Sequence, residues 1–99
     1  DQGKRDEAEP LFRRCLAVQE KLLGAEHPKT LCSMYNLAFF LKEKGVLDEA
    51  EIMARRSLEG YASRGLKADV KDGVRQLGGI LRAQKKDEEA DELEQRYNK

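Results

Sequence analysis

The chain has 99 residues, of which 38% are charged and 39% are apolar, and it carries 19 basic and 19 acidic side chains. Because balanced charge gives no net field toward polyanions, the composition disfavours nucleic acids and membrane surfaces as partners. The sequence has no apolar run close to the roughly 20 residues of a membrane span and no signal-peptide core at its start, so we expect a cytoplasmic protein.

Residues 5–23 are predicted to form the first helix, because apolar side chains recur along them at steps of three and four. These side chains are Ala8, Leu11, Phe12, Cys15, Leu16, Leu22 and Leu23. Gly24 should end the helix, since glycine readily adopts the left-handed conformation of a C-terminal cap. Cys15 and the second cysteine, Cys32, are expected to be free thiols, because two cysteines are too few for a disulfide framework.

A second helix is predicted from Pro28 to about Lys44, since a proline in the first turn gives up no intrahelical hydrogen bond. His27, the only histidine, precedes this proline and should have a loop or capping role. Gly45 should end the helix. The apolar pattern leaves Phe39 on another side of the helix from the buried residues, which are predicted to be Leu31, Met34, Leu37, Ala38, Phe40 and Leu41.

Three more helices are predicted over residues 47–62, 69–84 and 87–97. The fourth helix should turn four apolar residues inward: Val74, Leu77, Ile80 and Leu81. Short connections between five helices make neighbouring helices antiparallel. No alternating strand pattern competes with these assignments, so the sequence predicts an all-α fold.

Three short segments of the chain are similar to one another: residues 3–9, 45–51 and 85–91. Ala8, Ala50 and Ala90 hold the same place in the three segments and so recur at nearly equal intervals. A unit that cannot bury its own apolar face must stack on a neighbour, so the repetition predicts a helical solenoid. The acidic residues of each segment are expected to open a helix, where negative charge is stabilised.

Two further features of the repetition lead to expectations. Residues 13–14 and 55–56 are arginine pairs separated by the same interval as Ala8 and Ala50, and we expect them to lie on solvated faces. Residues 1–3 are similar to the helix end at residues 43–45. We therefore expect the chain to be a piece of a longer array.

The repeated positions resemble the tetratricopeptide repeat, in which large and small apolar residues alternate on paired helices. The middle unit carries the pattern at Met34, Leu37, Ala38, Leu41, Gly45, Ala50 and Ala54. The third unit carries it at Val74, Leu77, Gly78, Leu81 and Ala90, and an incomplete first unit at Ala8, Phe12 and Cys15. The 42-residue spacing, with residues 23–28 and 35–38, is similar to the kinesin-light-chain and nephrocystin-like subtype.

The resemblance implies one antiparallel helix-hairpin solenoid, a right-handed superhelix, over residues 1–99. Residues 1–24 would be the second helix of an incomplete repeat, 25–64 a full repeat and 65–99 a full C-terminal repeat. The third unit departs from the pattern because glycines interrupt its first helix. Among Gly73, Gly78 and Gly79, only Gly78 is expected to have a packing role.

The sequence contains no glycine-rich phosphate loop, no His-Glu-x-x-His pair and no Cys-x-x-Cys pair, and His27 has no second base or nucleophile near it. We therefore expect no enzymatic activity, no cofactor and no metal site. The resemblance instead implies a scaffold that binds a peptide or partner domain in the concave groove of stacked hairpins. Carried over by position, the peptide-binding residues are Tyr35, Asn36, Phe39, Lys42, Arg75, Gln76 and Arg82.

Several alternatives stay open at this point. Lys42, Arg75 and Arg82 outnumber Glu43 and Asp72 by one charge, which favours a mildly acidic peptide. Phe39 is predicted either to contact the peptide or to pack against a preceding helix. Asn36 is predicted to bond either the peptide backbone or an adjacent repeat. The alternative function is structural: the segment extends or caps a longer solenoid and self-associates through its incomplete first repeat.

Overall fold

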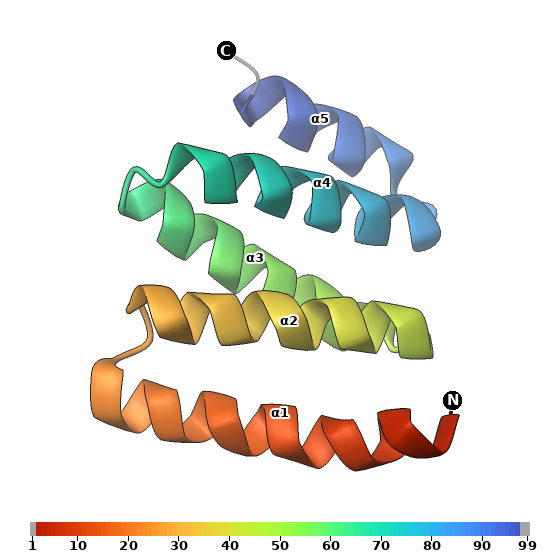
Figure 1. The fold of residues 1–99 in the computed structure, drawn as a ribbon. Helices are drawn as coiled ribbons and strands as arrows, with labels where there is room; N and C mark the ends of the chain where they lie inside the picture. Colours follow the sequence, from red (N-terminus) through yellow and green to blue (C-terminus); the bar gives the residue numbers. More distant parts are fainter. Residues whose placement is uncertain (1, 98–99) are drawn as a thin grey trace.

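The computed structural model describes residues 2–97 of the chain, with side chains from residue 7 onward. It consists of five helices: α1 (Gln2–Leu23), α2 (Pro28–Lys44), α3 (Leu47–Ser63), α4 (Lys67–Ala83) and α5 (Asp87–Tyr97). Each helix packs against the next one in the chain and runs antiparallel to it (Figure 1). The predicted all-α fold of stacked hairpins is confirmed.

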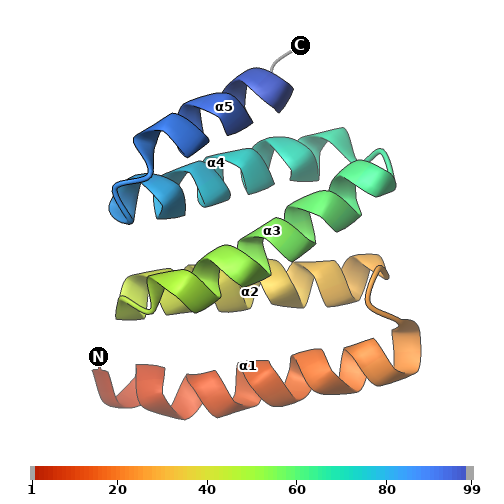
Figure 2. The ribbon, with the colours of Figure 1, turned by 180° about the vertical axis from the view of Figure 1, so that it is seen from behind.

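The helices form two layers in a body of 38 × 30 × 17 Å. In Figure 1, α3 passes behind α2, and in the reverse view of Figure 2 it lies in front of α2. Helices α2 and α4 are therefore neighbours on the face turned toward the viewer in Figure 1, where they contact each other directly. This shared face carries the residues predicted to bind a partner.

Helix α2 begins and ends at residues that the sequence marks. His27 is its N-cap, and the His27 Nδ1 accepts a hydrogen bond of 3.1 Å from the backbone N–H of Lys29. Gly45 follows the helix in the left-handed conformation, with φ +91°, and its N–H donates to the carbonyls of Leu41 and Lys42. The predicted capping role of His27 is confirmed.

Helix α1 begins earlier than predicted, at Gln2, so that Gly3 lies inside it. The expected helix end at residues 1–3 is therefore wrong at Gln2 and Gly3, and Asp1 lies outside the described residues. A single glycine costs a helix only about 1 kcal/mol relative to alanine, which residues on both sides can outweigh. The acidic residues of α1 consequently lie beyond its first turn, whereas α3 and α5 do begin with the predicted acidic residues.

The core lies between α2, α3, α4 and α5. Leucines interlock there with Ala38, Ala50 and Ala54, whose exposed fraction is 0%. Among the described side chains of α1, Leu16 is the one that belongs to the buried core, and Phe12 packs against that core. The other apolar residues predicted along α1 are mostly exposed, including Leu11, Cys15, Leu22 and Leu23. The outer side of α1 is therefore an open apolar surface.

Two glycines set the spacing between helices. A Cβ on Gly60 of α3 would overlap the side chain of Leu31 on α2, and a Cβ on Gly73 of α4 would lie 3.1 Å from Leu58 Cδ1 on α3. Gly78 is buried, but a Cβ there would meet only the guanidinium of Arg82, at 4.0 Å. The packing role predicted for Gly78 is therefore wrong.

An ion triad occurs twice along the stack, at positions related by the repeat. Glu9 pairs with Arg13 at 3.0 Å and with Lys44 at 2.6 Å, and Glu51 pairs with Arg55 at 2.8 Å and with Lys86 at 3.0 Å. Hydrogen bonds from Lys44 and Arg13 lower the pKa of Glu9. Each triad joins the N-terminal half of one helix to the place where the next helix ends.

The sequence predicted the arginine pairs as solvated residues, but members of both pairs also form ion pairs between helices. Arg13 also pairs with Glu49 of α3 at 2.6 Å, and Arg56 of α3 pairs with Glu20 of α1 at 3.1 Å. Both contacts connect α1 to α3, which is the second helix after it in the chain. The arginines still keep about two fifths of their side chains exposed, so each pair contributes at most ~1 kcal/mol.

We predict opposite effects of alanine at two buried helical glycines. Gly60→Ala should lower the free energy of unfolding by about 1–3 kcal/mol, because the added methyl group overpacks the contact with Leu31. Gly78→Ala should raise it by up to about 1 kcal/mol, because alanine is the better helix former and the position has room. Urea denaturation of both variants measures the difference, and equal effects would contradict the proposed spacing role of Gly60.

Candidate functional site

The seven residues predicted to bind a peptide lie on α2 and α4, and the structure brings two pairs of positions together. The Gln76 Nε2 donates a hydrogen bond of 2.8 Å to the backbone carbonyl of Tyr35. Lys42 reaches across from α2 to α4, where its Nζ lies 3.1 Å from the place of a Cβ on Gly79. Tyr35, Lys42 and Gln76 therefore form the seam between the two helices.

Gln76 has one unused polar atom. Its side chain is buried, and among the residues that the structure describes its Oε1 has no hydrogen-bond partner. A buried acceptor without a donor carries a desolvation cost of about 1–3 kcal/mol. Because this oxygen is buried beneath the surface, a molecule that binds on the surface does not reach it.

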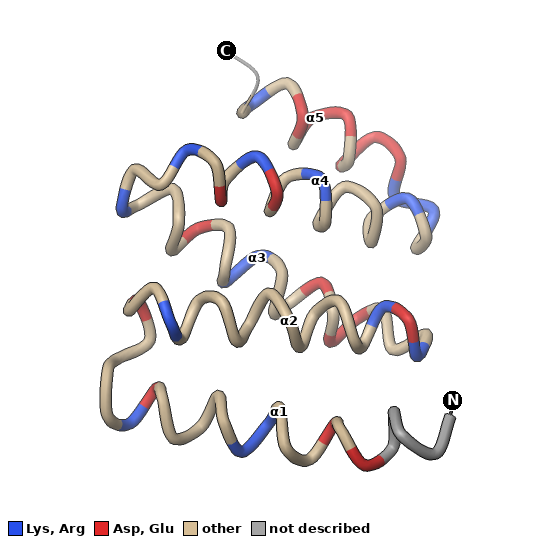
Figure 3. Tube along the Cα trace, in the orientation of Figure 1, with Lys and Arg blue, Asp and Glu red and all other residues tan. Residues whose placement is uncertain are grey.

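Asn36 and Phe39 lie on the exposed side of α2. Phe39 is 57% exposed, as the apolar pattern predicts. The amide of Asn36 is exposed and makes a long contact of 3.8 Å with the sulfur of Cys32. Figure 3 shows that the middle of α2, residues 30–41, carries no charged residue. An apolar ring and an amide therefore stand together on an uncharged stretch.

Arg82 lies at the other edge of the surface and points to α5. Its guanidinium donates hydrogen bonds to the carboxylates of Asp91 and Glu94. These two carboxylates outnumber the one-charge surplus that favoured an acidic peptide. Of the three cations predicted on the surface, Lys42 and Arg75 are the two that do not pair with Asp91 or Glu94.

A recess opens between α1 and α2 at one end of this surface. It has a volume of ≈ 610 Å³ and is lined by Phe12, Asn36, Phe39, Phe40 and Glu43. The rings of Phe12 and Phe40 form its wall, with centroids 5.7 Å apart. We call this feature the α1–α2 recess. The sequence predicted Phe40 as a buried residue and Phe12 as a repeat residue, and no local pattern indicated the recess that the two rings border.

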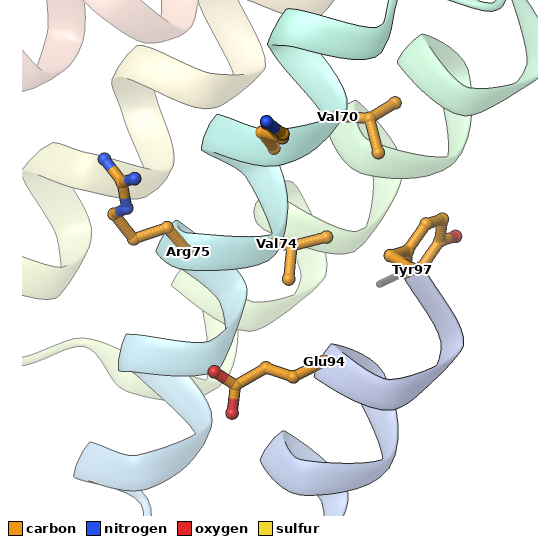
Figure 4. Close-up of a pocket in the computed structure, with 6 residues that line it drawn as sticks. Val70, Val74, Arg75, Glu94 and Tyr97 are labelled. Carbon is orange, nitrogen blue, oxygen red and sulfur yellow. The ribbon is translucent and has the colours of Figure 1, made fainter. Parts of the chain in front are cut away.

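A second recess, of ≈ 310 Å³, lies between α4 and α5 and is lined by Val70, Lys71, Val74, Arg75, Glu94 and Tyr97. Figure 4 shows Val70 and Val74 on the side of α4 that faces the ring of Tyr97, whereas Arg75 extends away from that ring. Arg75 therefore stands between the recess and the α2–α4 surface.

Residues 1–63, which include α1, α2 and α3, match the family model of the tetratricopeptide repeat. The chain belongs to the tetratricopeptide repeat family. A comparison with curated proteins found no match. Domains of this family generally bind other proteins and are typically noncatalytic. The predicted divisions at residues 24–25 and 64–65 stay predictions, and residues 1, 98 and 99 of these units lie outside the described part of the chain.

The described side chains include neither a metal-binding cluster nor a membrane-spanning helix. No set of three or more histidine, cysteine, aspartate or glutamate residues is arranged to hold a metal ion within this part of the repeat array. Among the same residues, none of the five helices has both the length and the apolar character of a membrane crossing. Cys15 and Cys32 are both exposed and unbonded to each other.

We predict that two amides at equivalent positions of successive repeats differ in their effect on stability. Gln76→Ala should lower the free energy of unfolding by about 0.5–1.5 kcal/mol, because the hydrogen bond to the Tyr35 carbonyl is lost while the cost of the unpaired Oε1 is relieved. Asn36→Ala should leave it within about 0.5 kcal/mol of the parent value, since an exposed substitution removes no buried bond. Thermal and urea unfolding check both values, and a loss at Asn36 as large as at Gln76 would contradict this assignment.

Proposed function

We propose that this tetratricopeptide repeat segment is a noncatalytic scaffold that binds a peptide or partner domain across the exposed sides of α2 and α4. The observation that carries the proposal is the 57% exposed ring of Phe39, which no helix covers among the described residues. An accessible aromatic ring beside polar groups suits a binding hot spot. The general protein-binding role of the family supports the same function.

The proposed roles of the other residues follow from their contacts. Asn36 is exposed and would exchange hydrogen bonds with a partner backbone, whereas Gln76 is buried and would support the surface from within. Lys42 and Arg75 would meet an acidic residue of the partner. The backbone carbonyl of Tyr35 accepts a hydrogen bond from Gln76 and so holds that side chain in place. Arg82 would take part only if a partner carboxylate replaced Asp91 or Glu94.

The proposal also covers the repeat subtype, the cellular location and the absence of a cofactor. The 42-residue period supports the kinesin-light-chain and nephrocystin-like subtype. We also propose a cytoplasmic location and a function without cofactor. The equal numbers of basic and acidic residues support protein partners over nucleic acids or membranes.

Affinity capture with the full-length parent protein tests this function. A Phe39→Ala, Asn36→Ala double variant should lose at least one partner that the parent protein retains, because the ring and its neighbouring amide are removed together. The matched control is Ile52→Ala with Gln95→Ala, which removes an exposed apolar group and an exposed amide from α3 and α5. Unchanged partner recovery by the Phe39 and Asn36 variant would refute the proposed binding surface.

A second function is favoured by the exposure of α1. Leu11, Val18 and Leu22 are 63%, 48% and 74% exposed and lie on one side of the helix. The described part of α5, at the other end of the stack, instead exposes Glu88 and Glu92. We propose that α1 extends a longer solenoid or joins a second copy. Since the α1 end is the more apolar of the two ends among the described residues, two copies would meet through identical faces in a closed dimer.

Sedimentation velocity over a concentration series tests self-association. The parent chain should show a rising sedimentation coefficient, and Val18→Glu should keep it at the monomer value, because a buried charge disfavours the apolar contact. Far-UV circular dichroism verifies that the variant keeps its helices. A coefficient that does not change with concentration would exclude self-association of this chain.

A further inference from the structure

The side chain of Lys42 lies across the seam between α2 and α4. Its Nζ is 3.1 Å and its Cε 3.9 Å from the place that a Cβ on Gly79 would occupy. Gly79 corresponds to Phe39 at the repeat offset of 40. A side chain at residue 79 would crowd the Lys42 ammonium, and one as large as phenylalanine would take its place. The absence of a side chain at Gly79 therefore lets Lys42 rest on α4.

Lys42 brings a positive charge to this seam without a negative partner. The ion pairs among the described side chains include one between Lys44 and Glu9 but none of Lys42. The side chain of Lys42 is also half-buried. A cation that has lost part of its water and meets no anion gains from a bound negative group. The Lys42 ammonium is thus open to an anion that the described residues do not supply.

The equivalent position of the next repeat shows which groups such a cation binds. Arg82 corresponds to Lys42 at the same offset of 40. The guanidinium of Arg82 pairs with the carboxylates of Asp91 and Glu94 on α5. Carboxylates are therefore the groups that this chain itself places beside a cation at this position of the repeat.

The described part of the preceding repeat offers Lys42 no such carboxylate. Asp91 and Glu94 correspond, again at an offset of 40, to Glu51 and Ala54 of α3. Glu51 already pairs with two other cations, at 2.8 and 3.0 Å. Ala54 is uncharged and has an exposed fraction of 0%. A carboxylate beside Lys42 would therefore come from a bound partner.

We propose that Gly79 is a specificity-determining residue of the binding surface. Because Gly79 leaves room for Lys42 at the seam, the surface selects a partner segment that has a carboxylate for Lys42 and an apolar side chain for Phe39. A lysine displaced from the seam would no longer hold its charge at a fixed distance from the ring. This inference rests on the proposed protein-binding function and specifies the chemistry of the partner.

The spacing of the two partner groups follows from the places of their contacts on α2. Phe39 and Lys42 are three residues apart in one helix, so their Cβ atoms are about 5–6 Å apart. Asn36, one turn earlier, is exposed, and its amide can bond a backbone whose N–H and C=O groups are unpaired, as in an extended segment. Side chains on one side of an extended segment are two residues and about 7 Å apart. The fitting segment therefore carries its acidic residue two positions from its apolar residue.

Selection from a library of random peptides displayed on phage tests the inference on the full chain. Peptides enriched on the parent chain should share an acidic residue two positions from an apolar residue. Selection on Lys42→Glu should instead enrich lysine or arginine at the acidic position, because the variant reverses the charge that the peptide meets. Such an exchange reports direct contact between the two positions, and a general loss of folding would not produce it.

A peptide enriched on the parent chain, synthesised with a fluorescent label, provides the second measurement. Fluorescence anisotropy should show that Lys42→Gln weakens its binding about tenfold, because a charge-assisted contact is lost. Gly79→Ala should weaken binding about threefold, because the added Cβ displaces the ammonium. In a chain that already carries Lys42→Gln, Gly79→Ala should have no further effect, since the charge it displaces is gone.

The neighbouring glycine provides the matched control. A Cβ on Gly78 would meet only the guanidinium of Arg82, at 4.0 Å, so Gly78→Ala should leave the affinity of the peptide unchanged. Both alanine variants should raise the midpoint of thermal unfolding, because alanine is the better helix former. Weaker binding by a more stable Gly79→Ala chain therefore cannot result from unfolding.

Several outcomes would overturn this inference. Peptide binding that Gly79→Ala leaves unchanged would show that residue 79 does not position Lys42. Enriched peptides without an acidic residue, or with one three or four positions from the apolar residue, would contradict the bound carboxylate or the extended conformation. Binding that Phe39→Ala weakens but Lys42→Gln does not would leave the proposed function standing and refute this inference alone. Failure to enrich any peptide whose binding needs Phe39 would count against both.

Discussion

The close approach of neighbouring helices at positions without large side chains holds this small repeat structure together. Gly60 admits Leu31 between α2 and α3, and Gly73 admits Leu58 between α3 and α4. Alanines with no exposed surface fill the same seams. Tight interlocking matters because a chain of this length, with 38% charged residues, has few apolar side chains from which to build a core.

Helix α1 is attached to the stack in a different way. It contributes Leu16 and the ring contact of Phe12 with Phe40, and it is also linked to α2 and α3 by polar contacts. These links are the ion pairs Glu9–Lys44, Arg13–Glu49 and Glu20–Arg56, and the hydrogen bond between Ser33 and Gln19. Partly exposed ion pairs stabilise a structure only slightly. They do, however, orient α1 so that its apolar side faces away from α3 and remains accessible.

The described ends of the stack are consequently unequal. In α4, Lys71 and Arg75 occupy the positions that Leu31 and Tyr35 hold in α2, one repeat earlier, and α5 exposes carboxylates. Charged groups at these positions disfavour the packing of another apolar helix. The end formed by α1 instead exposes leucines and an aromatic recess. Among the described residues, the most exposed leucines and phenylalanine therefore lie on α1 and the adjoining side of α2.

The sequence predicted the five helices, their order and most of the apolar residues that α2 and α4 bury. Periodicity suffices for these features, because a helix needs only local hydrogen bonds and one apolar side. The sequence likewise predicted the cap at His27 and the exposed ring of Phe39. The prediction for Gly78 failed because a local pattern does not show which atoms approach a glycine. The prediction for Gly3 failed because the pattern does not show whether flanking residues continue the helix.

The sequence by itself thus determined the repeat architecture, the helix ends around α2 and the amphipathic pattern that places the core. Only the tertiary structure decided that Gly60 sets the helix spacing, that Arg82 is held by α5 and that Phe12 and Phe40 border an open recess. Each of these depends on distances between residues far apart in the chain. Such distances follow from how helices pack, which a local pattern of residues does not contain.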